Sequence, residues 1–563
     1  MDYRKIIIYA ALVVVALFLW NAWQREFPPK AVQPSTVQQS QTQTAPTTSD
    51  STKSSVPSVP QNGAQPQRAK STVPQAAHIA KNGEFIHVKT DVLDVLIDTH
   101  GGNLKQAKLL KYPLSLKMPQ EKVALFNSNA DTYYVAQSGL TGKQGPDTQK
   151  GLARYTTAKT QYHLSAGQKQ LTVPLHWRNA RGLMVTKTYV FHRGSYTVGM
   201  DYHINNKSSK PWTGYVYTQL ARTKVAHKGS LLTHYATFVG AAVSSPAKHY
   251  DKLKFKNFAD EPLNQTVQGG WAAMIQQYFL SAWVPPAKQT YHYYTRVNNG
   301  IYTVGMIGPA ITVAAAQTLN TENKLYVGPA IASRLDAVAP HLSMAVDYGW
   351  LWFISEIIFW LMKLIHTFVG NWGWSIILTT VVIKLIFYPL SDKSFRSMAK
   401  MRKLQPRMAQ LKERHGSDRQ AMSRATMEMY RKEKVNPLGG CLPMVIQIPV
   451  FIGLYWVIMQ SVELRQAPWM FWVKNLSVHD PYYILPVLMG LLMLVQQKLS
   501  PPPPDPTQAK IMMFMPVMFT VFFLTFPSGL VLYWLTNTLV TILHQYYVIR
   551  RVERQDKLKK RKK

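Results

Sequence analysis

The sequence has a single cysteine, Cys441, which lies inside an apolar stretch. A lone cysteine excludes an intramolecular disulfide, so a large exported domain in this chain has to be stable without one. Such a domain needs a hydrophobic core of its own.

Acidic residues are scarce. The chain has 28 Asp and Glu against 64 Lys and Arg, which gives a formal net charge of +36 over 563 residues. This excess indicates nucleic-acid binding, attraction to anionic lipid, or the charge bias of loops in a membrane protein. Only the location of the charges can distinguish these alternatives.

Motifs for catalysis and cofactor binding are missing as well. The histidines of the central region are scattered, and no Gly-rich phosphate loop or other nucleotide motif is present. Such motifs are how nucleotide and metal sites are recognised in a sequence. We therefore predict no enzymatic activity, no cofactor and no metal site.

Long apolar runs occur only at the extreme N-terminus and after about residue 345. Residues 6–23 carry no charge, follow Arg4 and Lys5, and are long enough to cross about 30 Å of hydrocarbon as a helix. No small-residue cleavage site follows them, so we interpret residues 1–24 as an uncleaved transmembrane anchor. A cleaved signal peptide is the alternative.

The next two regions differ in composition. Residues 25–80 are rich in Gln, Ser, Thr and Pro, which predicts a disordered linker. Residues 81–345 contain short stretches with period-two alternation, such as KQLTVPLHW and LMVTKTYVFH, separated by Gly, Asn and Pro. This pattern is typical of strands and predicts an antiparallel β-sandwich domain with a binding or spacing role.

The C-terminal part predicts an all-α polytopic bundle. One span lies within residues 371–391 and four lie within 438–549, at about 438–460, 482–497, 510–526 and 528–549; with the anchor they make six crossings. The segment before them, 346–370, has Glu356, Lys363 and His366 on one helical face. That arrangement favours an amphipathic helix lying in the membrane interface.

The basic residues cluster in two segments. Residues 392–437 have thirteen Lys and Arg against five acids, and the tail 550–563 has nine against two. The positive-inside rule places both segments in the cytoplasm, which fits the four crossings between them and exports the β domain with both termini inside. Orientation alone explains these charges, and binding of ribosomal RNA or acidic lipid headgroups is a compatible reading.

Residues 392–437 also predict an antiparallel helical hairpin, because apolar residues recur at three-to-four spacing on either side of Gly416. The methionines of this pattern either hold the two helices together or offer a soft surface to varied nascent apolar segments. They are Met398, Met401, Met408, Met422 and Met429.

Lys384 is the candidate functional charge. No Asp or Glu lies within the six predicted spans, and Lys384 lies inside the span at 371–391. A charge at mid-membrane costs about 2.5–3.5 kcal/mol on insertion scales, so this lysine needs water, a partner or a route to the surface. Pro389 marks the cytoplasmic end of the span, roughly 7–8 Å away at 1.5 Å per residue, and snorkelling to that surface is the alternative to a wet cavity.

Polar residues of several spans favour the cavity. Together they are numerous enough to line a wet groove in the inner leaflet, with water or a transient anionic guest as the counterpart of the lysine. These residues are Thr379, Thr380, Gln447, Thr536, Asn537 and Thr538.

Long ordered motifs carry a resemblance to a known family. They include DYGWLWFIS, FVGNWGWSIILTTVVIKLIFYPL, EKVNPLGGCLPMVIQIPVFIGLYW, FPSGLVLYW and, in the β domain, KTDVLDVLIDTHGGNLKQA. The chain resembles the YidC insertases of Gram-negative inner membranes over essentially its whole length. The β-domain motifs indicate the Gram-negative form with a large periplasmic domain.

This resemblance implies a non-enzymatic insertase and chaperone for inner-membrane proteins, with an exported β-sandwich, an interfacial helix, a five-helix core and a hairpin needed for activity. The implied partners are nascent membrane proteins, the Sec translocon, ribosomes delivered by the SRP pathway and membrane lipids, and we expect a functional monomer. The family has arginine where this chain has Lys384, which keeps the charge but loses the planar five-donor fork. The substrate-contacting positions correspond to Thr380 and to Tyr533 or Trp534.

Two other functions stay open from the residues alone. A transporter of lipid or small solute would call for internal repeats or intramembrane carboxylates, and the sequence shows neither. A sensor that binds a periplasmic ligand through its β domain would be abolished by deletion of residues 81–320, whereas an insertase would keep working.

Overall fold

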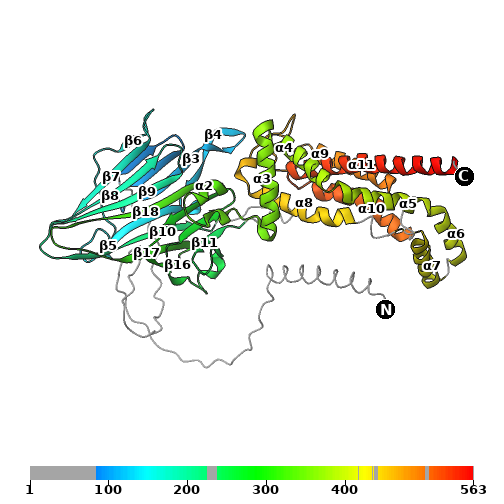
Figure 1. Cartoon of the computed structure of the whole chain (residues 1–563). Coiled ribbons are helices and arrows are strands. Elements are labelled where there is room, and N and C mark those ends of the chain that lie inside the picture. The colour runs from blue at the N-terminus through cyan, green and yellow to red at the C-terminus, as the bar shows by residue number, and fades with distance from the viewer. Residues whose placement is uncertain are drawn as a thin grey trace, which may run out of the picture. The chain divides into compact units, whose positions relative to one another are not determined.

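The computed structural model describes residues 84–224, 238–415, 418–433, 435, 442–500 and 506–561. The predicted anchor and linker, residues 1–80, lie outside the described residues. Strands occupy the first part of the described chain and helices the second, as Figure 1 shows.

Eighteen strands lie in the described part of the β domain, and alternation of apolar residues explains most of them. Their bounds are β1 Phe85–Lys89, β2 Leu93–Asp98, β3 Asn103–Ser115, β4 Met118–Phe126, β5 Tyr134–Gly142, β6 Gln161–His163, β7 Gln170–Arg178, β8 Leu183–His192, β9 Thr197–Asn206, β10 Trp212–Thr223, β11 Gly240–Ser244, β12 Asp251–Leu253, β13 Asn264–Gln268, β14 Trp271–Gln276, β15 Phe279–Val284, β16 Thr290–Asn298, β17 Ile301–Val313 and β18 Thr318–Pro329.

These strands build two sheets that share one hydrophobic core. The first has ten strands in the order β13-β16-β17-β10-β5-β3-β2-β1-β6, with β4 paired to β3. The second has eight, in the order β12-β11-β14-β15-β18-β9-β8-β7. The hydroxyl of Tyr134 on β5 donates to Met274 O on β14, and Trp283 Nε1 on β15 donates to Gln219 O on β10, so polar contacts also join the layers.

One pair departs from the predicted antiparallel arrangement. Strand β6 pairs in parallel with β1, while the other pairs are antiparallel. A parallel pair needs a long connection, and β2 to β5 lie between these two strands in the chain. Local alternation carries no information about such a distant pairing.

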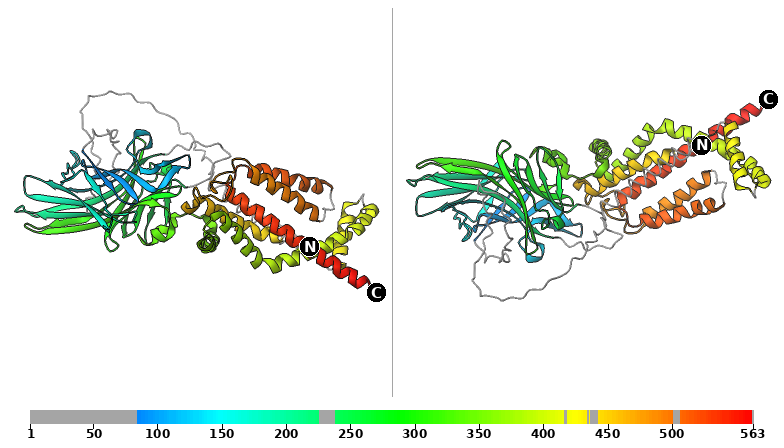
Figure 2. Two further views of the ribbon diagram at one scale, coloured as in Figure 1. Left: turned by 90° about the horizontal axis from the view of Figure 1, so that it is seen from above. Right: turned by 90° about the horizontal axis from the view of Figure 1, so that it is seen from below.

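The helical part begins after the last strand. Its α-helices are α2 Ala332–Asp336, α3 Trp352–Val369, α4 Trp372–Ile386, α5 Tyr388–Lys403, α6 Gln405–His415, α7 Arg419–Lys432, α8 Leu442–Gln460, α9 Ile484–Leu499, α10 Pro506–Phe523 and α11 Ser528–Arg561. Helices α9 and α10 run side by side, and α11 packs against α4, α5, α8 and α9 (Figure 2).

A sharp bend separates α4 from α5. Helix α4 starts with a cap in which Asn371 Oδ1 accepts from Trp374 N at 3.2 Å, and it ends at Ile386. Pro389 lies in the first turn of α5, where its missing N–H costs nothing, and the two helices are bent by 70°. The predicted end of this span at Pro389 matches that bend.

Helix α3 runs across the direction of α4, α8 and α11 in Figure 1 and is seen end-on in Figure 2. Its buried residues, including Ser355, Ile358 and Met362, recur at helical spacing and face α4 and α8. The Ser355 hydroxyl donates to Gly453 O of α8 at 3.1 Å. Its other faces are strongly apolar and exposed, with Trp360 at 65% and Phe368 at 83%.

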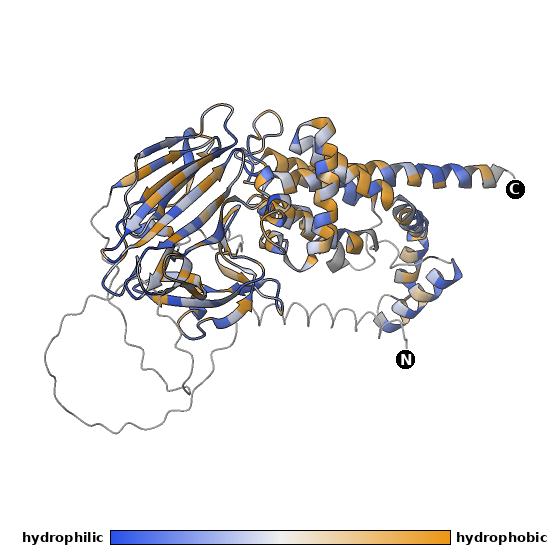
Figure 3. Cartoon of the chain, turned by 60° about the vertical axis from the view of Figure 1, so that its left-hand side comes forward, coloured by the Kyte–Doolittle hydropathy of each residue, from blue (hydrophilic) through white to orange (hydrophobic). Residues whose placement is uncertain are grey.

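By length and composition, residues 349–369 form the one described helix that is long and apolar enough to cross a membrane by itself. The bent pair α4 and α5 is long and apolar enough when the two helices are taken together, and the apolar parts of α8, α9 and α10 are shorter. Figure 3 shows hydrophobic residues dominating these helices and a mostly hydrophilic end of α11 near the C-terminus.

Helices α6 and α7 pack against each other as the arms of a hairpin with a small core of its own. The core holds Leu404, Met429, Tyr430 and Val435, with Met401, Met408 and Leu411 packed against it. The Asp418 side chain caps α7 by accepting from Gln420 N and Ala421 N. The predicted break at Gly416 lies outside the described residues.

Candidate functional site

Lys384 lies in the last turn of α4, facing α11. Its Nζ donates to Thr541 Oγ1 at 3.0 Å, and the Thr541 hydroxyl donates in turn to Asn537 O of its own helix at 2.6 Å. An ammonium has three donors, so one threonine oxygen leaves two of them for other partners.

A hollow of about 280 Å³ adjoins the lysine. Three helices form it, because the bend after Ile386 turns α5 away from α4 while α11 continues straight past both. Its lining residues are Val381, Lys384 and Leu385 of α4, Tyr388, Ser391 and Phe395 of α5, and Val540, Thr541, Leu543, His544 and Tyr547 of α11. The hollow is therefore mainly apolar, with the cation in one wall.

Two titratable residues that the sequence argument missed lie near Lys384: His544 lines the hollow, and Asp392 approaches the His544 ring. The His544 ring stacks on Tyr388 at 4.3 Å between centroids, and its Nε2 is 4.0 Å from Asp392 Oδ1. The other oxygen of Asp392 accepts from Arg396 Nε at 2.7 Å. Asp392 is eight residues after Lys384 and directly follows the predicted span, so its position in the sequence is the signal that points to it.

Most of the predicted groove residues lie at helix interfaces instead of lining this hollow. Thr379 and Thr380 are buried on α4, and the Thr380 hydroxyl donates to Ile376 O at 2.7 Å. Thr536 and Asn537 are buried on α11, and Thr536 donates to Leu532 O at 2.8 Å. Thr538, also on α11, is 2% exposed.

Two of these buried polar atoms, Thr379 Oγ1 and Asn537 Oδ1, have no hydrogen-bond partner among the described residues. Buried polar atoms are nearly always paired with protein or with ordered water. An ordered water would satisfy each of these two atoms, one on α4 and one on α11.

The remaining predicted residues form a separate cluster. Gln447 Nε2 of α8 donates to the hydroxyl of Tyr533, which is buried on α11. Trp534 packs edge to face on Phe451 at 5.1 Å between centroids and also contacts Phe523. The structure thus places Tyr533 and Trp534 in an aromatic contact between helices, outside the hollow beside Lys384.

The five predicted methionines of the hairpin divide into two groups. Met401, Met408 and Met429 belong to the small core that joins the hairpin arms. Met398 lies on α5, and Met422 is half-buried on α7 outside that core. A second hollow, of about 330 Å³, lies between the arms and is lined by Arg407, Arg414, Glu428 and Lys432 among others.

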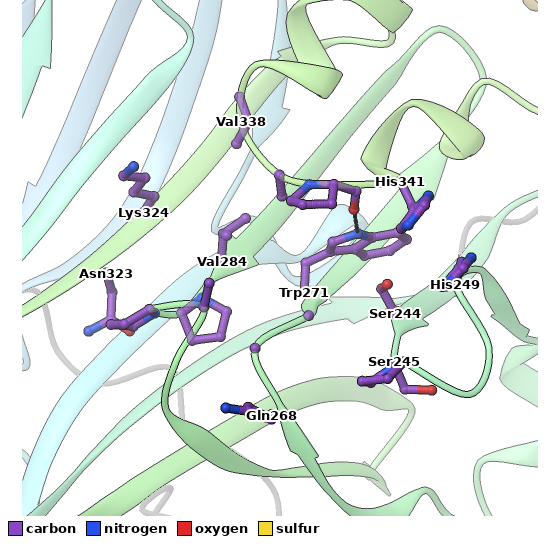
Figure 4. A pocket seen from close by; sticks show the side chains of 18 of the residues that line it. Ser244, Ser245, His249, Gln268, Trp271, Val284, Asn323, Lys324, Val338 and His341 are labelled. Carbon is purple, nitrogen blue, oxygen red and sulfur yellow. Dashed lines mark hydrogen bonds between the residues drawn. The ribbon is translucent and has the colours of Figure 1, made fainter.

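A hollow of about 410 Å³ lies in the β domain (Figure 4). Stacked rings of His249 and His341, 3.9 Å apart, lie on one side, and the indole nitrogen of buried Trp271 donates to Pro340 O. Asn323 lines the hollow and is 2% exposed, and neither of its amide atoms has a partner among the described residues. No local pattern of residues predicts this arrangement.

A second lysine, Lys187, is fully buried between the two sheets. Its Nζ donates to Ser138 O at 2.8 Å and to Gly101 O at 3.1 Å, and the rings of Tyr155, Tyr189 and Tyr202 surround it at 5.4 to 5.8 Å. Burial lowers the pKa of Lys187, and the negative charge of the neighbouring Asp147 opposes that shift. Burial likewise raises the pKa of Asp147.

A metal centre is not evident in the part of the chain that the structure describes, since it contains no cluster of three or more His, Cys, Asp or Glu side chains able to hold an ion. The site around Lys384 can bind through charge, hydrogen bonds and apolar contact.

Comparisons with known proteins match nearly the whole chain. A family model described as the YidC periplasmic domain matches residues 85–361, and one described as 60Kd inner membrane protein matches residues 364–556.

Three curated relatives are each named membrane protein insertase YidC. That of Coxiella burnetii (strain CbuK_Q154) is 49% identical over 571 residues, covering 100% of this chain and 99% of the relative. That of Legionella pneumophila (strain Corby) is 46% identical over 570 residues, covering 100% and 99%. That of Stutzerimonas stutzeri (strain A1501) is 45% identical over 559 residues, covering 98% and 99%.

Proposed function

Because the chain belongs to the YidC family of membrane protein insertases, we propose that it assists the insertion, folding and assembly of inner-membrane proteins, alone or with the Sec translocon. The observation that carries this proposal is the half-buried ammonium of Lys384 beside an apolar hollow. Such a site offers a client segment both a positive counter-charge and an apolar surface, and it requires no covalent step.

The proposed topology has six crossings: the anchor 1–24, α4, α8, α9, α10 and α11. Both termini and the helices α5 to α7 lie in the cytoplasm and the β domain lies in the periplasm, which the basic charge of 392–437 and 550–563 supports. Helix α3 lies in the membrane interface. Its orientation across α4, α8 and α11 supports this placement, although its length would also allow a crossing.

The proposed groove is hydrated from the cytoplasmic side. A lysine held in hydrocarbon costs about 2.5–3.5 kcal/mol, and a single threonine hydroxyl is a weak substitute for water. The unpartnered oxygens of Thr379, five residues before Lys384, and of Asn537, four residues before Thr541, support water near the lysine. The spare donors of Lys384 then attract acidic or polar residues of an incoming segment.

Short helices are the second part of the mechanism. Helix α9 has 16 residues and so measures about 24 Å at 1.5 Å per residue, less than the roughly 30 Å of a typical hydrocarbon core. A bilayer thins around helices that are too short for it. A thinned bilayer beside a hydrated groove lowers the barrier for moving a short hydrophilic segment across.

The hairpin α6–α7 and the tail are the proposed contacts for translating ribosomes, the SRP pathway and lipid headgroups, with the protein acting as a monomer. Three of the five methionines hold the hairpin together, which leaves Met398 and Met422 as candidates for client contact. Met427, which is 56% exposed, is a third candidate for client contact.

Crosslinking to a stalled nascent membrane protein tests the proposal. Thr380 is 1% exposed, so the photoreactive residue is better placed at Leu385, which lines the hollow and is 64% exposed. Ile357 of α3 is the matched control, being apolar and 65% exposed but absent from the hollow's lining. We expect adducts from Leu385 and few from Ile357. Equal yields from both positions would contradict a groove-based mechanism.

A further inference from the structure

Strands β3 and β4 form an arm at the edge of the β domain. Among the described strands, β4 pairs with β3 alone, and the register shifts twice between Leu109 and Ser115 as the arm leaves the sheet. Ser115 pairs with Met118, so Leu116 and Lys117 form the turn. We call residues 111–122 the β3–β4 arm; Figure 1 shows β4 at the margin of the sheet.

The tip of the arm is apolar and open to solvent. Leu114, Leu116 and Met118 are 50%, 47% and 48% exposed. Two-residue hairpin turns favour Gly, Asn and Asp, so leucine at such a turn has no advantage for the local fold. Exposed apolar side chains gathered at one tip, against the preference of the turn, indicate that something covers them.

Lysines surround these apolar residues. The segment 105–122 contains five lysines and a single acid, Glu121, for a net charge of +4. Lys111 and Lys117 are exposed on the arm itself. Apolar residues flanked by lysines are the pattern of segments that lie at the boundary between lipid headgroups and acyl chains.

Hydrogen bonds connect the arm to the membrane core. Leu114 O accepts from Arg465 Nη2 at 3.1 Å and from Gln466 Nε2 at 3.3 Å. These two residues directly follow the turn Val462–Leu464 at the end of α8. In the same turn Glu463 forms an ion pair with Lys363 of α3 at 3.3 Å. The arm therefore contacts the loop that also contacts α3.

This loop and α3 carry exposed aromatic residues, and the interfacial position proposed above for α3 puts them at the level of the membrane surface. Trp352 and Trp360 of α3 are 56% and 65% exposed, and Phe471 of the loop is 71% exposed. Aromatic side chains gather at the headgroup level of bilayers. The apolar tip of the arm continues this surface, because its backbone is bonded to the same loop.

We propose that the β3–β4 arm is a second membrane contact of the β domain, in which Leu114, Leu116 and Met118 enter the periplasmic leaflet and the adjoining lysines bind the phosphates of anionic lipids. The partner is thus the lipid surface, and not a second protein. The arm would hold the β domain close to the bilayer beside α3.

Spin labelling of the full chain in vesicles tests this. In a Cys441→Ser background, a nitroxide at Leu116→Cys is compared with one at Gln168→Cys, in the exposed turn between β6 and β7. The vesicles contain phosphatidylethanolamine and phosphatidylglycerol and no other protein. We expect the label at 116 to collide more with oxygen than with a soluble nickel chelate, and the label at 168 to show the reverse.

Equal access of the nickel chelate to both labels would overturn the proposal, as would shielding of position 116 that appears only when another membrane protein is added. Substituting Lys111 and Lys117 with Gln should lower the equilibrium constant for insertion of the arm into the bilayer about fivefold per lysine at low salt. The reduction should be smaller at high salt. Gln in place of the exposed Lys159 and Lys169 is the matched control. If replacing Lys111 and Lys117 leaves membrane contact unchanged, their assignment to lipid phosphates is wrong.

Discussion

Two lysines, Lys187 of the β domain and Lys384 of α4, are both withdrawn from bulk water, but their surroundings differ. Lys187 is fully enclosed, with two backbone carbonyls, three tyrosine rings and the charge of Asp147 around it. Lys384 has one threonine hydroxyl and an open hollow. The first cation has its partners built into the fold, whereas the second has donors free for a ligand.

This difference indicates separate roles. A buried charge whose partners are all fixed serves packing, and removal of the charge leaves those partners without a counterpart. A cation with unfilled donors beside a hollow contributes little to folding and is suited to binding. Lys187 should therefore matter for stability and Lys384 for insertion.

The largest expected effect is on the stability of the β domain. Lys187→Ala leaves the Gly101 and Ser138 carbonyls without their donor and removes the positive charge that acts on the buried Asp147, and removing one member of a buried charge arrangement costs about 3–5 kcal/mol. Urea unfolding of the purified chain, followed by near-UV circular dichroism, measures it. Lys159→Ala, at an exposed position, is the control, and a loss below about 1 kcal/mol for Lys187→Ala would remove the distinction between the two lysines.

The next effect is on insertion. Lys384→Ala should lower the yield of inserted client about tenfold, equivalent to roughly 1.4 kcal/mol, while the free energy of unfolding changes by less than about 1 kcal/mol. Lys384→Arg should keep most of the activity, because the charge is retained. Protease protection of a client in a depletion strain measures the yield. Full activity of Lys384→Ala would exclude the charge from the mechanism.

A smaller effect is expected at the partner of Lys384. Thr541→Val removes the acceptor of the ammonium, but water in the hollow can replace it, so insertion should fall only about two- to threefold, in line with the ~0.5 kcal/mol lower end for a hydrogen bond. Thr520→Val removes a similar hydroxyl bond, to Pro516 O, in α10, which contributes no residue to the lining of the hollow. Equal losses in both variants would mean that the effect is one of packing.

The smallest effect concerns water at Thr379. If the unpartnered hydroxyl binds water, Thr379→Val costs about 0.5–1 kcal/mol in the free energy of unfolding, because that hydrogen bond is lost. In a dry interface the same substitution would be neutral or stabilising. Thermal unfolding in detergent distinguishes these results, with Thr380→Val, whose hydroxyl is bonded to Ile376 O, as the comparison.

Local patterns in the sequence predicted many elements well. The alternation in LMVTKTYVFH corresponds to β8, in which Leu183, Val185 and Tyr189 are buried, and the proline at 389 marks the bend between α4 and α5. The same alternation places Lys187 inside, but a strand pattern cannot show which carbonyls and rings will meet that ammonium. The hairpin was predictable because its apolar spacing is local to α6 and α7.

The site was less predictable. Lys384 was found because a charge in an apolar run stands out in any sequence. Thr541 is 157 residues away, and the approach of His544 to Asp392 depends on how α11 packs along α5. The polar residues expected around the lysine lie mostly between helices. The prediction missed this because composition shows that a helix carries polar groups but does not show which neighbouring helix covers them.

The sequence by itself determined the division into a β domain and apolar helices, the excess of positive charge in two segments, and the isolation of one lysine in a span, since each depends on residues close together in the chain. Only the tertiary structure decided that Lys384 faces a hollow between three helices, that Lys187 is enclosed, and that the β3–β4 arm contacts the loop after α8. These features arise from contacts between distant segments, whose geometry is set by packing of the whole molecule.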